Sequence, residues 1–198
     1  MSYKALKSGT DVRGVASDLG GKEVNLTDAA VYDITSAFAT FVAAKYGKKT
    51  NELTVAVGHD SRISAYRISM QVISALKNLG VRVLNCNLAS TPAMFMTTVD
   101  LGTDGAVQIT ASHHPFDRNG LKFFIKEGGL ESAQLGEIIE IADQGGFEQK
   151  DGGSVENIDY MSTYSAGLRK KICDAIGKTE EEKPLSGYHI VVDAGNGV

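Results

Sequence analysis

Apolar residues recur along this chain at two spacings, and the two alternate from beginning to end. Spacings of three and four positions predict five helices, within 28–42, 65–79, 91–101, 135–142 and 156–177. Short and mostly apolar runs at 53–57, 81–86, 105–110 and 121–125 predict four buried strands. Strands that alternate with helices are typical of α/β proteins. We therefore expect a three-layer α/β/α domain around a mixed, mostly parallel, four-stranded sheet.

A further strand pattern, HIVVD at 189–193, follows the charged segment KTEEEKP and runs into the Gly-rich sequence AGNGV. A strand that leads directly into a Gly-rich turn is a common beginning of an α/β domain. The sequence therefore predicts a first domain over residues 1–184, which includes the linker helix 156–177. Residues 185–198 are expected to open a second, incomplete α/β domain with its first strand.

Charge and composition exclude several classes of function. The formal net charge is −4, whereas nucleic-acid binding requires clustered Lys and Arg, so we expect no nucleic-acid partner. No apolar run approaches the roughly 20 residues that span a bilayer, and the N-terminal residues lack the apolar core of a secretory signal. We expect a cytoplasmic protein without a membrane partner.

Cys86 and Cys173 lie in apolar patterns without metal-ligand spacing, which predicts buried free thiols. The sequence gives no indication of the oligomeric state.

The side chains with chemical potential lie where predicted strands end, which is where ligands of α/β sheets bind. Arg62 and Ser112 follow two such strands, Arg13 lies in a turn beside a glycine, and Lys122 lies on the strand after the Ser112 loop. Cations gathered in an acidic protein favour an anionic small molecule, because the Arg fork fits phosphate oxygens. For Arg62 a second interpretation stays open, a structural ion pair with Asp60 at a helix start.

Ser112, within TASHHPFDRNGLKFF, leaves three interpretations open: a nucleophile, a phosphate carrier or an ordinary loop residue. A serine hydrolase would require an acidic partner for His113 and usually a G-x-S-x-G elbow, which TASHH is not. A phosphoserine requires backbone N–H donors and nearby cations, which the loop and Lys122 can supply across the Asn119-Gly120 turn. The residue types favour a phosphate carrier, but by themselves they do not exclude the other two interpretations of Ser112.

The Ser112 segment closely resembles a family signature. TASHHP at 110–115, followed by NG at 119–120 and by Lys122, is similar to the TASHNPxxxNGxK motif of the α-D-phosphohexomutases. Further segments resemble family motifs in the expected order: TDVRG at 10–14, VAVGHDSRIS at 55–64, TP at 91–92, DG at 104–105 and HIVVDAGNGV at 189–198. Two positions depart from the family pattern, because His114 stands where asparagine is commonest and His59 where arginine is frequent.

The resemblance implies the phosphoserine-bearing first domain of a four-domain enzyme. Such an enzyme is an intramolecular phosphotransferase that interconverts hexose 1-phosphate and hexose 6-phosphate, of glucose or mannose, through a bound hexose 1,6-bisphosphate. Ser112 is then the phosphate carrier, and Arg13 and Lys122 assist by acid/base action and charge stabilisation. The weaker assignments implied are His113, which shapes the loop, and the phosphate or substrate contacts Thr110, Asn119 and Arg62.

The resemblance also implies Mg²⁺, bound through the phosphate on Ser112. Its other ligands belong to a DGDGDR-type motif, and no such motif occurs in this sequence. The chain by itself is then expected to hold only the phosphoserine half of the site and not to turn over. Two alternatives remain: a phosphoglucosamine-type mutase of the same family, and a non-catalytic homologue that only binds sugar phosphates.

Overall fold

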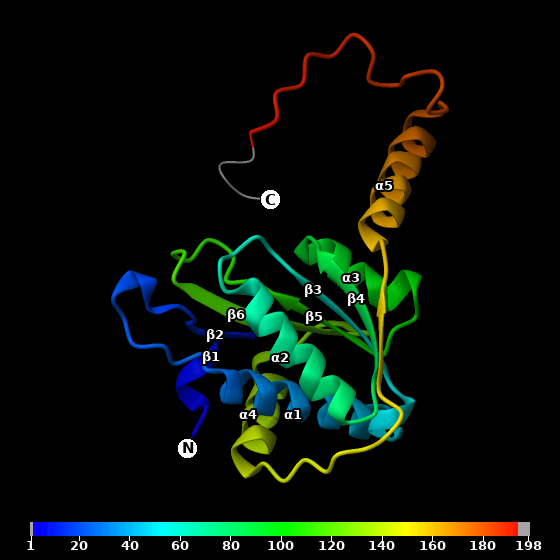
Figure 1. Ribbon diagram of the computed structural model, residues 1–198. Helices are drawn as coiled ribbons and strands as arrows, with labels where there is room; N and C mark the ends of the chain where they lie inside the picture. The colour runs from blue at the N-terminus through cyan, green and yellow to red at the C-terminus, as the bar shows by residue number, and fades with distance from the viewer. Residues whose placement is uncertain (1, 194–198) are drawn as a thin grey trace. The chain divides into compact units, whose positions relative to one another are not determined.

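The computed structural model describes residues 2–193, which fall into two compact units that meet between Ile158 and Asp159 in the sequence. The first unit is a single sheet with helices on both faces (Figure 1). The second unit contains one long helix and the segment that follows it. Within the described residues, no helix combines the length and the apolar character that a membrane span requires.

The sheet contains eight strands in the described part of the chain, in the order β1-β2-β6-β5-β3-β4-β8, with β7 paired to β6. The pairings of β3 with β4, of β3 with β5 and of β4 with β8 are parallel. The pairings β1–β2, β2–β6, β5–β6 and β6–β7 are antiparallel. The strands are β1 (Lys7–Ser8), β2 (Asp11–Val15), β3 (Thr54–His59), β4 (Arg82–Leu88), β5 (Gly105–Ile109), β6 (Arg118–Ile125), β7 (Gly128–Gly129) and β8 (Ser154–Asn157).

All four predicted strands of the first domain are present, but the sheet is larger and less parallel than expected. The strands β1, β7 and β8 have only two to four residues, too few for a recognisable period. The strand β2 has a buried charged residue, Asp11, and a partly buried one, Arg13, so its sequence resembles that of a loop. The strand β6 begins at Arg118, so that Asn119 and Gly120 pair with β2 and do not form the expected turn.

The five predicted helices are all present, and several of their ends follow ordinary capping rules. Thr27 accepts a hydrogen bond from the Ala30 N–H at the start of α1, and Ser90, one residue before the expected Thr91, caps α3. Gly80, expected to end α2, has φ of 80°. The helices are α1 (Asp28–Tyr46), α2 (Ala65–Asn78), α3 (Thr91–Asp100), α4 (Ser132–Gln144) and α5 (Tyr160–Ile176), with short 3₁₀ turns at Lys4–Leu6, Asp18–Gly20 and Thr50–Glu52.

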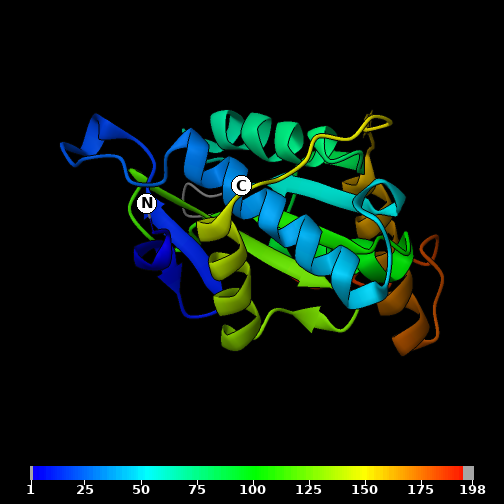
Figure 2. The ribbon, with the colours of Figure 1, turned by 90° about the horizontal axis from the view of Figure 1, so that it is seen from below.

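The helices of the first unit form layers on both faces of the sheet. The helices α1, α2 and α4 cover one face, and α3 lies on the other (Figures 1 and 2). Neighbouring residues of β6 show this division, because successive strand residues point to opposite faces. Phe123 stacks on Phe38 of α1 at 4.4 Å between ring centroids, whereas Phe124 lies against Phe95 of α3 at 5.8 Å. The predicted three-layer α/β/α arrangement with a mixed sheet is therefore confirmed.

The strand expected at 189–193 is not present in the structure. The described residues 188–193 are assigned to no strand and pair with no other segment in the sheet, and residues 194–198 lie outside the described part. A strand is defined and stabilised by a hydrogen-bonded neighbour, so an apolar run without one does not become a strand. The second domain that the sequence predicts from residue 185 therefore stays a prediction.

Candidate active site

The loop that follows β5 presents Ser112 to solvent in an unusual backbone conformation. Ser112 is exposed and has φ of 55°, in the left-handed region that costs a non-glycine residue about 1–3 kcal/mol. Two hydrogen bonds hold the turn: the Ser112 N–H donates to Thr110 Oγ1 (2.9 Å), and the His114 N–H donates to the Ala111 carbonyl (3.1 Å). Strained residues persist where surrounding contacts enforce them, which is frequent at functional sites.

Arg62 supplies most of those enforcing contacts. Its Nε donates to Asp60 Oδ2 at 3.2 Å, and its side chain is only 12% exposed. Nη1 and Nη2 donate at 2.6–3.0 Å to four loop carbonyls, those of Ser112, His114, Pro115 and Arg118. These five bonds occupy all five N–H donors of a guanidinium group. In this structure the guanidinium group is directed to Asp60 and the loop carbonyls, as the alternative interpretation expects, and the phosphate contact of Arg62 stays a prediction.

Two other predicted contacts are also directed into the protein. Asn119 is fully buried, donates from Nδ2 to Ser64 Oγ (3.0 Å) and accepts from the Gly120 N–H (2.8 Å). Thr110 is buried, and its hydroxyl oxygen accepts from the Ser112 N–H. Both groups are hydrogen-bonded within the protein, as buried polar groups usually are, and the substrate contacts of Thr110 and Asn119 stay predictions. The two side chains shape the loop that carries Ser112.

Arg13 and Lys122, in contrast, lie together beside this loop and share a carboxylate. Arg13 Nη1 donates to the Ala111 carbonyl (3.0 Å), one residue before Ser112, and Nη2 donates to Asp11 Oδ2 (2.8 Å). Lys122 Nζ donates to the other oxygen, Asp11 Oδ1, at 2.6 Å. The structure thus brings together the two cations that the sequence predicts, and it adds Asp11, which sequence reasoning did not identify.

The register of the sheet explains this meeting. Arg13 of β2 pairs with Gly120 of β6, and alternate residues share a face, so that Asp11, Arg13 and Lys122 lie on one side of the sheet. A side chain at position 120 would overlap with the Val12 carbonyl oxygen and come within 2.9 Å of the Thr110 carbonyl. Glycine at this position therefore allows β2 and the Ser112 loop to approach β6 closely.

The two histidines of the loop lie in a positive environment. His113 Nδ1 is 3.3 Å from Ser112 Oγ, and the rings of His113 and His114 stack at 5.1 Å. Partial burial, followed by the positive charge of Arg13 and Arg118, lowers the pKa of His114. Among the described residues no carboxylate bonds to His113, so the acid–histidine pair of a serine hydrolase is not formed here. The arrangement is suited to an anion.

The described residues do not form a metal site by themselves. No group of three or more His, Cys, Asp or Glu side chains among residues 2–193 could hold a metal ion. The carboxylates of the loop region are already paired, Asp60 with Arg62 and Asp11 with two cations. The side chains of residues 2–193 therefore supply no complete set of Mg²⁺ ligands by themselves.

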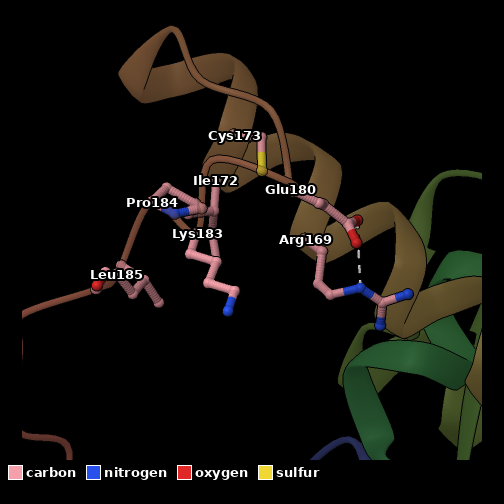
Figure 3. A pocket seen from close by; sticks show the side chains of 8 residues that line it. Arg169, Ile172, Cys173, Glu180, Lys183, Pro184 and Leu185 are labelled. Carbon is pink, nitrogen blue, oxygen red and sulfur yellow. Dashed lines mark hydrogen bonds and ion pairs between the residues drawn. The ribbon is translucent and has the colours of Figure 1, made fainter.

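A separate cavity of about 330 Å³ lies in the second unit, between α5 and the segment that follows it (Figure 3). Its walls are mostly apolar and include Ile172, Cys173 and Leu185, with an ion pair between Arg169 and Glu180 at 3.3 Å. It contains none of the predicted site residues. Cys173 and Cys86 are both buried free thiols, as predicted, and burial raises the pKa of Cys86 to about 12.

Comparison with known proteins identifies relatives of this chain. The family model described as phosphoglucomutase/phosphomannomutase, alpha/beta/alpha domain I, matches residues 6–149. A phosphoglucomutase of Neisseria gonorrhoeae is 31% identical over 189 residues, 95% of this chain and 36% of that protein. A phosphoglucosamine mutase of Sulfurovum sp. is 35% identical over 199 residues, 96% of this chain and 41% of that protein.

A solved structure shares the fold. The crystal structure of a phosphoglucomutase/phosphomannomutase family protein from Burkholderia thailandensis aligns with a TM-score of 0.69 at 24% identity. The alignment covers 83% of this chain and 35% of the other. This chain thus spans well under half the length of the relatives it matches. Since the family model covers most of its residues, the chain belongs to the phosphoglucomutase/phosphomannomutase family and contains the α/β/α domain I of that family.

Proposed function

We propose that this chain is the phosphoserine-bearing first domain of a phosphohexomutase that interconverts hexose 1-phosphate and hexose 6-phosphate. The observation that carries the proposal is the placement of Ser112, exposed on a strained turn beside Arg13 and Lys122. Phosphoryl transfer depends mainly on positioning and charge neutralisation, which a fixed loop and two cations provide.

The proposed reaction moves one phosphoryl group between Ser112 and the sugar. The bond between phosphorus and Ser112 Oγ breaks, a bond from phosphorus to a hydroxyl oxygen of the bound hexose monophosphate forms, and the hydroxyl proton passes to Ser112 Oγ or a nearby base. The product is a hexose 1,6-bisphosphate, which returns its other phosphoryl group to Ser112 after reorientation. Arg13 and Lys122 stabilise the charge on the transferring group, and Lys122 is the candidate for moving the proton.

The proposal extends to substrate and cofactor. Glucose or mannose phosphate is the first proposed substrate, and glucosamine phosphate is the second, because relatives named phosphoglucosamine mutase match almost the whole chain. Mg²⁺ is proposed to bind the phosphate on Ser112, where it would neutralise charge, with ligands from outside this chain. The proposed setting is cytoplasmic, and the chain alone is expected to be inactive.

Intact-mass spectrometry of the complete gene product that contains this chain tests the proposal. After incubation with glucose 1,6-bisphosphate, the wild type should carry one phosphoryl group, located on Ser112 by peptide mapping. Ser112→Ala should lose it, whereas Ser154→Ala, an exposed serine on β8, should keep it. A wild type that never carries phosphate overturns the proposal, and labelling of Ser112 by an acyl-type probe would favour a hydrolase. Turnover of glucose, mannose and glucosamine 1-phosphates then identifies the substrate.

A further inference from the structure

Asp11 is a buried carboxylate between the two cations of the site. The residue is 7% exposed, and each of its oxygens accepts from a different cation, Oδ2 from Arg13 and Oδ1 from Lys122. A buried carboxylate requires such partners, because an unpaired charge in the interior is costly. The pairing also fixes Arg13 relative to Lys122, although the two cations come from different strands.

The pairing leaves most of the hydrogen-bonding capacity of both cations available. Within the described part of the chain, the bonds of Arg13 to Ala111 and Asp11 use two of its five N–H donors. Lys122 uses one of its three donors, on Asp11, and its side chain is 28% exposed. Asp11 therefore orients both groups while the remaining donors can bind phosphate oxygens.

A continuous series of contacts connects this carboxylate to Ser112. Lys122 bonds Asp11, Asp11 bonds Arg13, and Arg13 bonds the Ala111 carbonyl, which is joined directly to the Ser112 N–H group. A displacement of Asp11 would thus move both cations and release the residue before Ser112. Displacements of about 1 Å in such positioning groups can cost on the order of 100-fold in rate.

We propose that Asp11 is a positioning residue for phosphoryl transfer, which holds Arg13 and Lys122 in place beside Ser112. This inference rests on the proposed function. Asp11 does not contact the transferring group; it acts through the two cations. A purely structural role would instead be limited to neutralising two charges within the fold.

The chain offers a matched control for that structural role. Asp104 is also buried and also bonds two cations, Lys48 at 2.7 Å and Lys126 at 2.9 Å, but it precedes β5, whereas Ser112 follows it. Asp104→Asn removes the same kind of doubly paired carboxylate at the opposite end of the strand. It should lower thermal stability without changing the rate of the folded enzyme.

Steady-state kinetics of the complete gene product, together with thermal unfolding, test the inference. Asp11→Asn is expected to lower kcat about 10- to 100-fold with little change in KM, at temperatures where it is fully folded. Asp11→Glu, which keeps the charge but moves it by one methylene, should recover part of this loss. The rate at which glucose 1,6-bisphosphate phosphorylates Ser112 should likewise be highest in the wild type, lower in Asp11→Glu and lowest in Asp11→Asn.

Two results would overturn the inference: a folded Asp11→Asn protein with wild-type kcat, or equal losses of kcat in Asp11→Asn and Asp104→Asn. In both cases wild-type Ser112 still becomes phosphorylated, so the proposed function stands. If wild-type Ser112 never accepts phosphate, the proposed function fails, and the role of Asp11 in transfer fails with it. Phosphorylation of the wild type therefore distinguishes the two failures.

Discussion

Arg62 organises the Ser112 loop, and its replacement is expected to destabilise the protein more than replacement of an exposed arginine does. Arg62→Met keeps much of the apolar stem but removes the five bonds to Asp60 and the loop carbonyls. Arg62→Lys keeps the charge but offers a compact ammonium group, which cannot reach five acceptors arranged around a planar fork.

The environment of each bond sets the expected magnitude. The bonds to the Ser112 and Pro115 carbonyls are exposed, so water can replace the arginine there. The bonds to the His114 and Arg118 carbonyls are partly buried, and a bond from a charged donor contributes about 1.5–3 kcal/mol. After the change Asp60 still accepts a bond from the Arg62 backbone N–H, so the sum counts only the two carbonyl bonds. Together these two contribute about 3–6 kcal/mol, and relief of the strain at Ser112 returns about 1–3 kcal/mol. The net loss for Arg62→Met is therefore about 3 kcal/mol.

Thermal unfolding and hydrogen exchange measure this loss. For a domain of this size, about 3 kcal/mol corresponds to a fall in Tm of roughly 6–12 °C. The backbone amides of His114 and Arg118, which bond within the loop, should exchange faster, whereas amides in β4 should not. Phosphorylation of Ser112 should also slow, because its backbone is no longer held at positive φ.

The exposed pair between Arg82 and Glu156 provides the control. Both side chains are more than half exposed although the bond is short, at 2.7 Å, so Arg82→Met should change stability by less than about 1 kcal/mol. The reasoning is refuted if Arg62→Met and Arg82→Met lower Tm equally, or if the loop amides of Arg62→Met exchange as in the wild type. Full stability of Arg62→Lys would show that charge alone, and not the fork, holds the loop.

Three further changes follow from the same contacts. Gly120→Ala should destabilise the domain by about 1–3 kcal/mol in urea unfolding, because the new methyl group would overlap with the Val12 carbonyl. Burial raises the pKa of Asp104, but bonds from two lysines and a backbone N–H outweigh burial and lower that pKa below its ordinary 3.8. The difference in unfolding free energy between wild type and Asp104→Asn should therefore stay constant above about pH 5 and become smaller as the pH falls through 3.8 and below. Phosphorylation of Ser112 should raise the pKa of His114 in an NMR titration, since added negative charge favours the imidazolium. An unchanged pKa would contradict the expected proximity of the phosphate to His114.

Hydrophobic spacing could predict the long elements of this fold but not the short ones. The helices α1 to α4 bury apolar residues at regular intervals, and the strands β3, β4 and β5 bury short apolar runs, both of which a sequence pattern detects. The strand β2 buries Asp11 beside Val12, and the negative charge of Asp11 is compensated by Arg13 of the same strand and Lys122 of β6. A spacing rule treats such charges as signs of solvent, so it cannot detect a strand whose charged residues are paired in three dimensions.

The same limit explains which site residues the sequence could predict. The sequence predicts Ser112, Arg13 and Lys122 as site residues because their residue types suit phosphate and their motifs are distinctive. In the structure the three residues lie close together. Thr110 and Asn119 have equally suitable groups, but in this structure those groups bond the Ser112 N–H and Ser64 Oγ. Sequence gives the donor and acceptor types, whereas only the folded chain decides whether they face a ligand or their neighbours. Asp11 would have been detectable as the i−2 neighbour of Arg13 on one strand face, had β2 been recognised.

The two arginines show how the structure separates roles that the sequence leaves equal. Both lie beside Ser112 and carry the same charge, so long-range attraction for a phosphate does not distinguish them. Arg13 has donors to spare, and an arriving phosphate can bind it without breaking the bonds to Asp11 and Ala111. Arg62 could bind the same phosphate only by releasing a loop carbonyl, and the turn that presents Ser112 would then relax. A ligand is therefore expected to bind through Arg13 because Arg62 is already occupied with holding the serine in place.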